Sequence, residues 1–278
     1  MLFIYFCIFV LLLLYFQITL INIYLSLGIV IILFLFIYFI SNPTELLYPY
    51  NLLIENLYEK TVFYSDEDKK KIFPTSILLE ENFLNIRDEC FNVLYNNKTL
   101  NNIGKNFIHQ NDDFWNGWKT YDLRMFGKDN KEHMDKCPIL KSILEKDDNI
   151  TGAFFSIMDP GKILPSHYGP FKGILRYHLG LMIPKKSIRE KQEQIGEQEQ
   201  IGEEREEHQC FISVDNQVYE WKDGEGILFD ETYKHFVYNK TKYHRVILFL
   251  DVKRPFESKT LTYINNFILF LMKYSPYN

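Results

Sequence analysis

The first 44 residues carry no charged side chain, and Glu45 is the first residue that does. Met1 to Ile40 is almost wholly apolar, and roughly 20 such residues suffice to cross a bilayer as a helix. One helix over residues 2–40 would measure about 58 Å, which is too long for one upright span. The segment therefore predicts a transmembrane anchor over 1–44, either as two spans that turn near Gln17–Asn22 or as one span over 18–40.

A cleaved signal peptide is the alternative interpretation of this segment. Such a peptide normally has a basic amino-terminal region and a cleavage site of small residues, and neither is present. Orientation in the membrane does not follow from the sequence, because no Lys or Arg precedes Lys60.

All charged residues lie in the remaining chain, where 31 basic and 36 acidic side chains give a net charge of −5. Nucleic acid is not expected as a partner, because phosphate binding needs a basic stripe and none is present. Four cysteines exclude a disulfide-dense scaffold. They also lack the C-x-x-C spacing of structural zinc sites.

Residues 45–110 mix short apolar stretches with Asn, Lys and Glu, and we expect a mixed, helical lead-in there. A helix is predicted within Glu80–Tyr95 from the spacing of Phe83, Ile86, Cys90, Phe91 and Leu94. A strand should follow after residue 114. Pro138 then suits the first turn of a second helix.

From Gly152 to Val252 the chain consists of short apolar runs divided by Gly, Pro and Asp. The runs are Phe154–Met158, Leu175–Ile183, Gln209–Val214, Gln217–Trp221, Gly226–Phe229 and Arg245–Val252. Asp215-Asn216 predicts a hairpin between two of them. Many short strands indicate a mainly β domain over 111–278, such as a jelly roll. The hexapeptide QEQIGE occurs twice in 192–203, which indicates a charged surface loop inserted over 189–208.

Histidines and arginines recur where these strands begin and end. His167 and His235 each come just beyond a predicted strand, and Arg245 begins the last one. Arg176 and His178 stand two apart in a strand, so their side chains share a face. Two neutral imidazoles can bind a divalent iron, and arginines can hold a dicarboxylate through bidentate hydrogen bonds. Each residue alone is a weak signal, whereas the combination predicts a site.

Four sequence blocks within Ser156–Pro255 carry a resemblance to a known family: SIMDPGKILPSHYGP, LRYHLGLMIP, GEGILFDETYKHFVYN and HRVILFLDVKRP. In this order they resemble the aspartyl/asparaginyl β-hydroxylases, a branch of the iron(II)/2-oxoglutarate dioxygenases, which use O2. The resemblance implies a double-stranded β-helix with iron held by His167 and His235 at its mouth. It also implies that Arg245 and Ser156 clamp the distal carboxylate of 2-oxoglutarate, and that Arg176 and His178 contact its other end.

The third metal ligand is the point where the pattern departs from the common iron triad. That triad is His-x-Asp/Glu…His, and Gly169 stands at its carboxylate position. The resembling family also lacks this carboxylate, which implies that water fills the place. Asp230 is predicted to orient that water, with a strand-end turn role as the alternative. Phe154 replaces a Lys of the animal peptide hydroxylases, which removes one cation from the predicted pocket.

We therefore expect a membrane-anchored, iron(II)- and 2-oxoglutarate-dependent hydroxylase. Its substrate is expected to be an Asp or Asn side chain of a protein, with a lipid acyl chain as the alternative. A non-catalytic, membrane-tethered β-barrel binding module is the third possibility. Sequons at Asn97, Asn149 and Asn239 favour a catalytic domain in the lumen of the endoplasmic reticulum. The apolar stretch 261–272 predicts a helix packed on the barrel or lying at the membrane surface.

Overall fold

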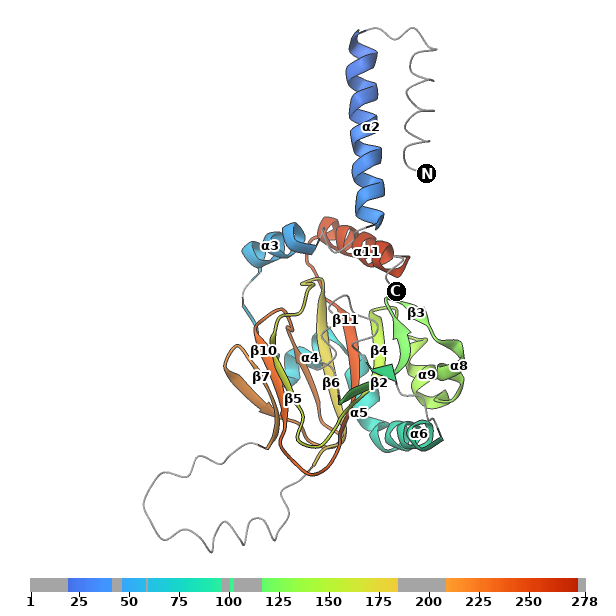
Figure 1. Cartoon of the computed structure of the whole chain (residues 1–278), viewed down its shortest axis with the longest axis vertical. Coiled ribbons are helices and arrows are strands. Elements are labelled where there is room, and N and C mark those ends of the chain that lie inside the picture. Colours follow the sequence, from blue (N-terminus) through green and yellow to red (C-terminus); the bar gives the residue numbers. More distant parts are fainter. Residues whose placement is uncertain are drawn as a thin grey trace, which may run out of the picture.

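Two antiparallel sheets form the body of the protein in a computed structural model, which describes residues 20–41, 47–58, 60–96, 101–102, 117–184 and 209–274. The larger sheet has the order β1-β2-β4-β11-β6-β9, with β3 paired to β2, and the smaller has the order β5-β10-β7-β8. From β4 to β11 the chain passes back and forth between the sheets (Figure 1). This is the strand arrangement of a jelly roll, which confirms the predicted mainly β fold.

The strands are β1 Asn101–Asn102, β2 Trp118–Met125, β3 Lys128–Asp129, β4 Ile150–Met158, β5 Ile163–His167, β6 Ile174–Met182, β7 Cys210–Val214, β8 Gln217–Glu220, β9 Gly226–Phe229, β10 His235–Asn239 and β11 Arg245–Lys253. The helices are α2 Leu20–Ser41, α3 Leu47–Leu57, α4 Asp66–Ile72, α5 Thr75–Glu81, α6 Phe83–Asn96, α8 Lys131–Asp135, α9 Pro138–Leu144 and α11 Lys259–Lys273.

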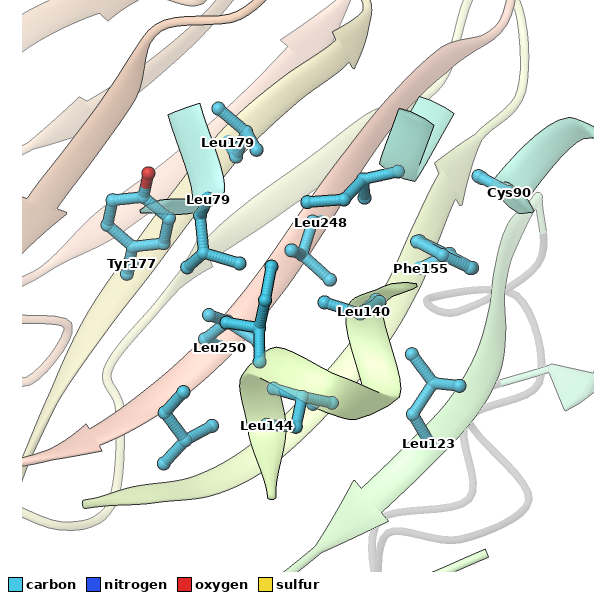
Figure 2. Close-up of a cluster of buried hydrophobic side chains, with 14 of the residues drawn as sticks. Leu79, Cys90, Leu123, Leu140, Leu144, Phe155, Tyr177, Leu179, Leu248 and Leu250 are labelled. Carbon is cyan, nitrogen blue, oxygen red and sulfur yellow. The ribbon is translucent and has the colours of Figure 1, made fainter. Parts of the chain in front are cut away.

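Both faces of the larger sheet are buried. In β11, Leu248 and Leu250 point into a core shared with α5, α6 and α9, which Figure 2 shows around Leu140 and Leu144. The intervening Phe249 points into a second core, between the two sheets. Because strand side chains alternate between faces, a strand covered on both sides needs apolar residues at every position. This requirement explains why β4, β6 and β11 are mostly apolar on both faces.

The predicted elements occur with small shifts of their ends. Pro138 is the first residue of α9, and Glu89 of α6 caps that helix by accepting the backbone N–H groups of Ile139 and Leu140. Asp215 and Asn216 have φ of 47° and 64°, the left-handed conformation of a two-residue hairpin turn. The helix predicted within Glu80–Tyr95 is confirmed as α6, in which Phe91 is 37% exposed.

Several predictions concern residues outside the described part of the chain. The charged loop over 189–208 lies there, as do residues 1–19 of the predicted anchor. Within the part that is described, no helix combines the length and the apolar character that a membrane crossing requires. The structure therefore gives no support to the predicted transmembrane segment.

A third apolar cluster joins α3 and α11 to the barrel. Leu47, Tyr50 and Ile54 of α3 pack with Leu261, Ile268 and Leu269 of α11, over Phe171 and Ile174. The carboxyl-terminal helix predicted over 261–272 is confirmed as α11, and its buried face lies in this cluster. Both helices lie on the side of the barrel from which α2 extends (Figure 1).

Candidate active site

His167 and His235 lie directly opposite each other in the smaller sheet. His167 is the last residue of β5 and His235 the first of β10, and the two are partners in the antiparallel register. They therefore belong to the strands, whereas the sequence placed them just beyond strand ends. Their ring centroids are 4.1 Å apart. The predicted histidine pair is thus brought together by strand pairing.

Backbone carbonyls fix the tautomer of both rings. The His167 Nδ1 atom lies 2.8 Å from the Pro165 carbonyl oxygen, and the His235 Nδ1 atom lies 2.9 Å from that of Tyr233. A carbonyl oxygen only accepts, so each Nδ1 must carry the proton and Nε2 keeps the lone pair. This is the arrangement in which a neutral imidazole binds a metal through Nε2.

Burial keeps these imidazoles neutral. It lowers the pKa of His167, with a further lowering by the Arg176 guanidinium. Burial and the neighbouring His167 lower the pKa of His235 to about 3. In the described ranges no three His, Cys, Asp or Glu side chains gather into a metal-binding group. The two facing imidazoles are donors of the kind that fit a divalent metal.

A pocket that is partly open to solvent lies against this pair. About half of its lining residues are apolar, and the others are Ser156, Arg176, His178 and Arg245 beside the two histidines. The Trp118 indole N–H donates to the Ser156 hydroxyl oxygen at 2.7 Å. The pocket therefore gathers every residue that the sequence analysis assigned to metal and co-substrate, apart from Asp230.

The two arginines of the pocket differ in their charge balance. Arg176 is paired with the carboxylates of Glu231 and Asp251, the latter at 2.9 Å. Arg245 is buried, and no Asp or Glu in the described residues forms an ion pair with it. Its guanidinium carbon lies 4.9 Å from the centre of the Trp221 ring, and burial lowers its pKa to about 10. An uncompensated buried cation is costly, so this position fits an anionic ligand.

His178 supplies a second set of unsatisfied polar atoms. Both of its ring nitrogens are buried without a hydrogen-bond partner, and burial among Phe229, Phe249 and Trp221 holds its pKa well below the usual range. A neutral imidazole offers one donor and one acceptor. The ring can therefore bind a carboxylate or keto oxygen of a ligand.

Asp230 does not lie where a water-orienting carboxylate is needed. Arg254 donates to one of its oxygens, and the backbone N–H and hydroxyl of Thr232 donate to the other. It is also absent from the residues that line the pocket. The structure thus favours the alternative, in which Asp230 fixes the turn after β9.

The neighbouring Glu231 occupies the space that the missing carboxylate would take. A Cβ atom added at Gly169 would lie 2.4 Å from the Glu231 Cγ and 2.8 Å from its Oε1. This Oε1 is buried and without a hydrogen-bond partner, and burial raises the pKa of Glu231 to about 7 against the opposing effect of Arg176. The sequence analysis missed this residue, because nothing in the pair Asp230-Glu231 tells which side chain turns toward Gly169.

Phe154 is part of the packing beside the site. Its ring stacks on Phe249 with centroids 4.0 Å apart, and Phe249 in turn lies under the Arg176 guanidinium at 3.9 Å. Phe154 itself is not among the residues that line the pocket. Phenylalanine at position 154 in place of a lysine therefore extends the apolar core. Among the described residues that line the pocket, Arg245 is then the cation that has no acidic partner.

Comparison with known proteins matches residues 80–255 to the family described as aspartyl/asparaginyl beta-hydroxylase. A similar curated protein is the ornithine lipid ester-linked acyl 2-hydroxylase of Rhizobium tropici, 34% identical over 58% of this chain and 50% of that protein. The aspartyl/asparaginyl beta-hydroxylase of Mus musculus is 29% identical over 64% of this chain and 21% of that protein. The chain thus spans about half and about a fifth of these relatives.

Proposed function

Since the chain belongs to the aspartyl/asparaginyl β-hydroxylase family, we propose that it is an iron(II)- and 2-oxoglutarate-dependent hydroxylase. The observation that carries this proposal is Arg245, a buried cation without an acidic partner in the described residues, in a pocket shared with the histidine pair. The net reaction converts 2-oxoglutarate, O2 and a substrate C–H group into succinate, CO2 and a C–OH group.

The residues of the pocket divide this work. His167 and His235 hold the iron through Nε2, because their Nδ1 protons are bound to backbone carbonyls. Bound iron supplies the O2-dependent oxidising chemistry of the reaction. Arg245 and Ser156 hold the distal carboxylate of 2-oxoglutarate, and His178 binds its other end. Glu231 fills the space beside Gly169 and pairs with Arg176.

For the substrate we propose an uncharged acyl chain of a membrane lipid. A substrate carboxylate would need a cation of its own, yet Arg176 is already neutralised by Glu231 and Asp251, and Arg245 is taken by the co-substrate. Apart from the residues assigned to iron and 2-oxoglutarate and Arg176, the lining side chains are apolar. The Rhizobium tropici relative, whose name gives an acyl chain as its substrate, supports this choice.

Protein Asp or Asn side chains are the second candidate substrate. The family description and the Mus musculus relative favour them. A lumenal location, which the sequons suggested, has less support, because the side chain of Asn239 is buried and donates to three backbone carbonyls. Asn149 remains exposed. A membrane location is proposed from the apolar first 44 residues.

Turnover of 2-oxoglutarate tests the proposal. The full chain in detergent, given iron(II), ascorbate and 2-oxoglutarate under air, is expected to release succinate, followed by NMR. Arg245→Met and His235→Ala should abolish this release, and Lys222→Met, at an exposed pair with Glu225, should leave it unchanged. Phospholipid vesicles should stimulate the rate and an Asp-containing peptide should not. A wild-type chain that neither binds 2-oxoglutarate nor releases succinate would reject the enzyme and favour the binding module.

A further inference from the structure

α3 and α11 carry apolar side chains on the faces that point away from the barrel. On α11 these are Tyr263, Ile264, Phe267 and Phe270, followed by Tyr274 at the end of the helix, with exposed fractions of 39–73%. On α3 they are Tyr48, Leu52, Leu53 and Leu57, with exposed fractions of 43–77%. Large side chains of this kind usually avoid water in a soluble protein. We call the two faces together the apolar platform.

The platform is distinct from the apolar surface that holds these helices on the barrel. In α11 the core-facing residues are Leu261, Asn265, Ile268, Leu269 and Leu271. At 100° per residue, Phe270 lies about 160° and Phe267 about 100° around the helix from Ile268. The packing of the fold therefore explains one face of α11 and leaves the other unexplained.

The charges of α11 fit a helix that lies flat in a membrane interface. Lys259 and Lys273, at its two ends, are the only charged residues in its 15 positions. Long lysine side chains can bury their stems while the ammonium group reaches water. Tyrosines such as Tyr48, Tyr263 and Tyr274 are typical of the boundary between headgroups and acyl chains. This pattern is characteristic of helices that bind in the plane of a bilayer surface.

The chain itself leads to this surface from an apolar segment. No charged residue occurs before Glu45, α3 begins at Leu47, and α2 extends from the same side of the barrel as α3 and α11 (Figure 1). We propose that the apolar platform of α3 and α11 docks on the surface of a lipid bilayer, with the outward side chains among the upper acyl chains.

Docking of the platform would fix the active site relative to the bilayer. The Asn51 side chain of α3 donates to the Pro170 carbonyl oxygen and accepts the Lys172 backbone N–H. Asn265 of α11 donates to the Gly173 carbonyl oxygen at 2.9 Å. These bonds hold the loop that directly follows His167. The metal-binding end of β5 is therefore tied to both helices of the platform.

Site-specific fluorophores on the full chain test the proposal. Cys7 is replaced by Ser, and Cys90, Cys137 and Cys210 are buried, so an introduced cysteine is the labelling site. Phe270→Cys on α11 and Leu52→Cys on α3 report on the platform. Leu84→Cys on α6 is the matched control, because Leu84 and Phe270 have exposed fractions of 57% and 55%. Each variant carries an NBD group and is reconstituted into phosphatidylcholine vesicles with or without brominated acyl chains.

Labels at 270 and 52 are expected to shift to shorter wavelength and to lose at least about half their emission to brominated lipid. The label at 84 should keep its aqueous spectrum. The proposal would be overturned if the labels at 270 and 52 were as exposed to water as the label at 84. The proposal would also be overturned if these labels shift to shorter wavelength but are not quenched by brominated lipid. A protein segment, from residues 1–19 or from a second copy, would then cover the platform. Succinate formation plays no part in this measurement, so either proposal can fail alone.

Discussion

Replacement of Arg245 by Met should stabilise the protein while it abolishes 2-oxoglutarate binding. Burial lowers the pKa of Arg245 from 12.5 to about 10. At about 1.4 kcal/mol for each pH unit, this difference corresponds to about 3 kcal/mol of destabilisation of the folded, charged form. Loss of the contact between Arg245 and Trp221 destabilises the variant by about 1–2 kcal/mol, which offsets part of this gain. We therefore expect Arg245→Met to raise the free energy of unfolding by about 1–2 kcal/mol.

Arg254→Met is the matched control, because Arg254 is also a buried arginine but has an acidic partner. It donates to Asp230, and also to the Lys172 carbonyl oxygen at 2.6 Å. Its removal leaves a buried carboxylate without its cation, which typically costs about 3–5 kcal/mol. Both substitutions replace an arginine by methionine, but Arg245→Met should raise the free energy of unfolding and Arg254→Met should lower it.

Urea denaturation in detergent, followed by tryptophan fluorescence, measures both effects. With Mn(II) present, 2-oxoglutarate at 100 times its Kd should add about 2.7 kcal/mol to the wild type. It should add nothing to Arg245→Met. If Arg245→Met destabilises the chain as strongly as Arg254→Met, then Arg245 has a structural partner. The pocket would in that case not be built to bind an anionic ligand.

Four further substitutions test other parts of the structure. His167→Ala and His235→Ala should each lose Mn(II) binding, measured by calorimetry, while circular dichroism stays unchanged. Gly180→Ala should destabilise the fold by about 1–3 kcal/mol in urea, because its Cβ would lie 2.2 Å from the Lys222 carbonyl oxygen; a variant as stable as the wild type would contradict this packing. Asn239→Ala should cost about 1–3 kcal/mol, because the backbone carbonyls of Met158, Asp159 and Tyr243 each lose a hydrogen bond from its amide, and mass spectrometry after secretory expression should find no glycan at Asn239.

The long strands β4, β6 and β11, which the sequence predicted, are buried along most of their length. Their apolar runs end at turn residues, and this signal is local. β5 and β10 were not predicted as strands. β5 contains Pro165 and is largely exposed, so its pairing with β10 depends on contacts between distant residues. The histidine pair was nevertheless found, because the sequence blocks that carry the resemblance include both residues.

Charge pairing is the part of the site that the sequence could not supply. Asp251 lies opposite Arg176 only through the register of β11 against β6. Glu231 reaches the same guanidinium from the turn after β9. Asp230 is neutralised by Arg254, 24 positions away. Which acid meets which base is therefore a property of the folded barrel, and the pairing of Asp230 with Arg254 could not be foreseen from the sequence.

The two sheets explain why the histidine pair, Arg245 and the apolar platform belong to one unit. His167 and His235 lie in the smaller sheet, whereas Arg245 and His178 lie in the larger one. A ligand that contacts both the histidine pair and Arg245 would therefore lie between the two sheets. The loop after His167 is held by α3 and α11, so the same rigid framework reaches the apolar platform. A substrate presented at that surface would meet the iron at a position set by packing and not by a moving domain.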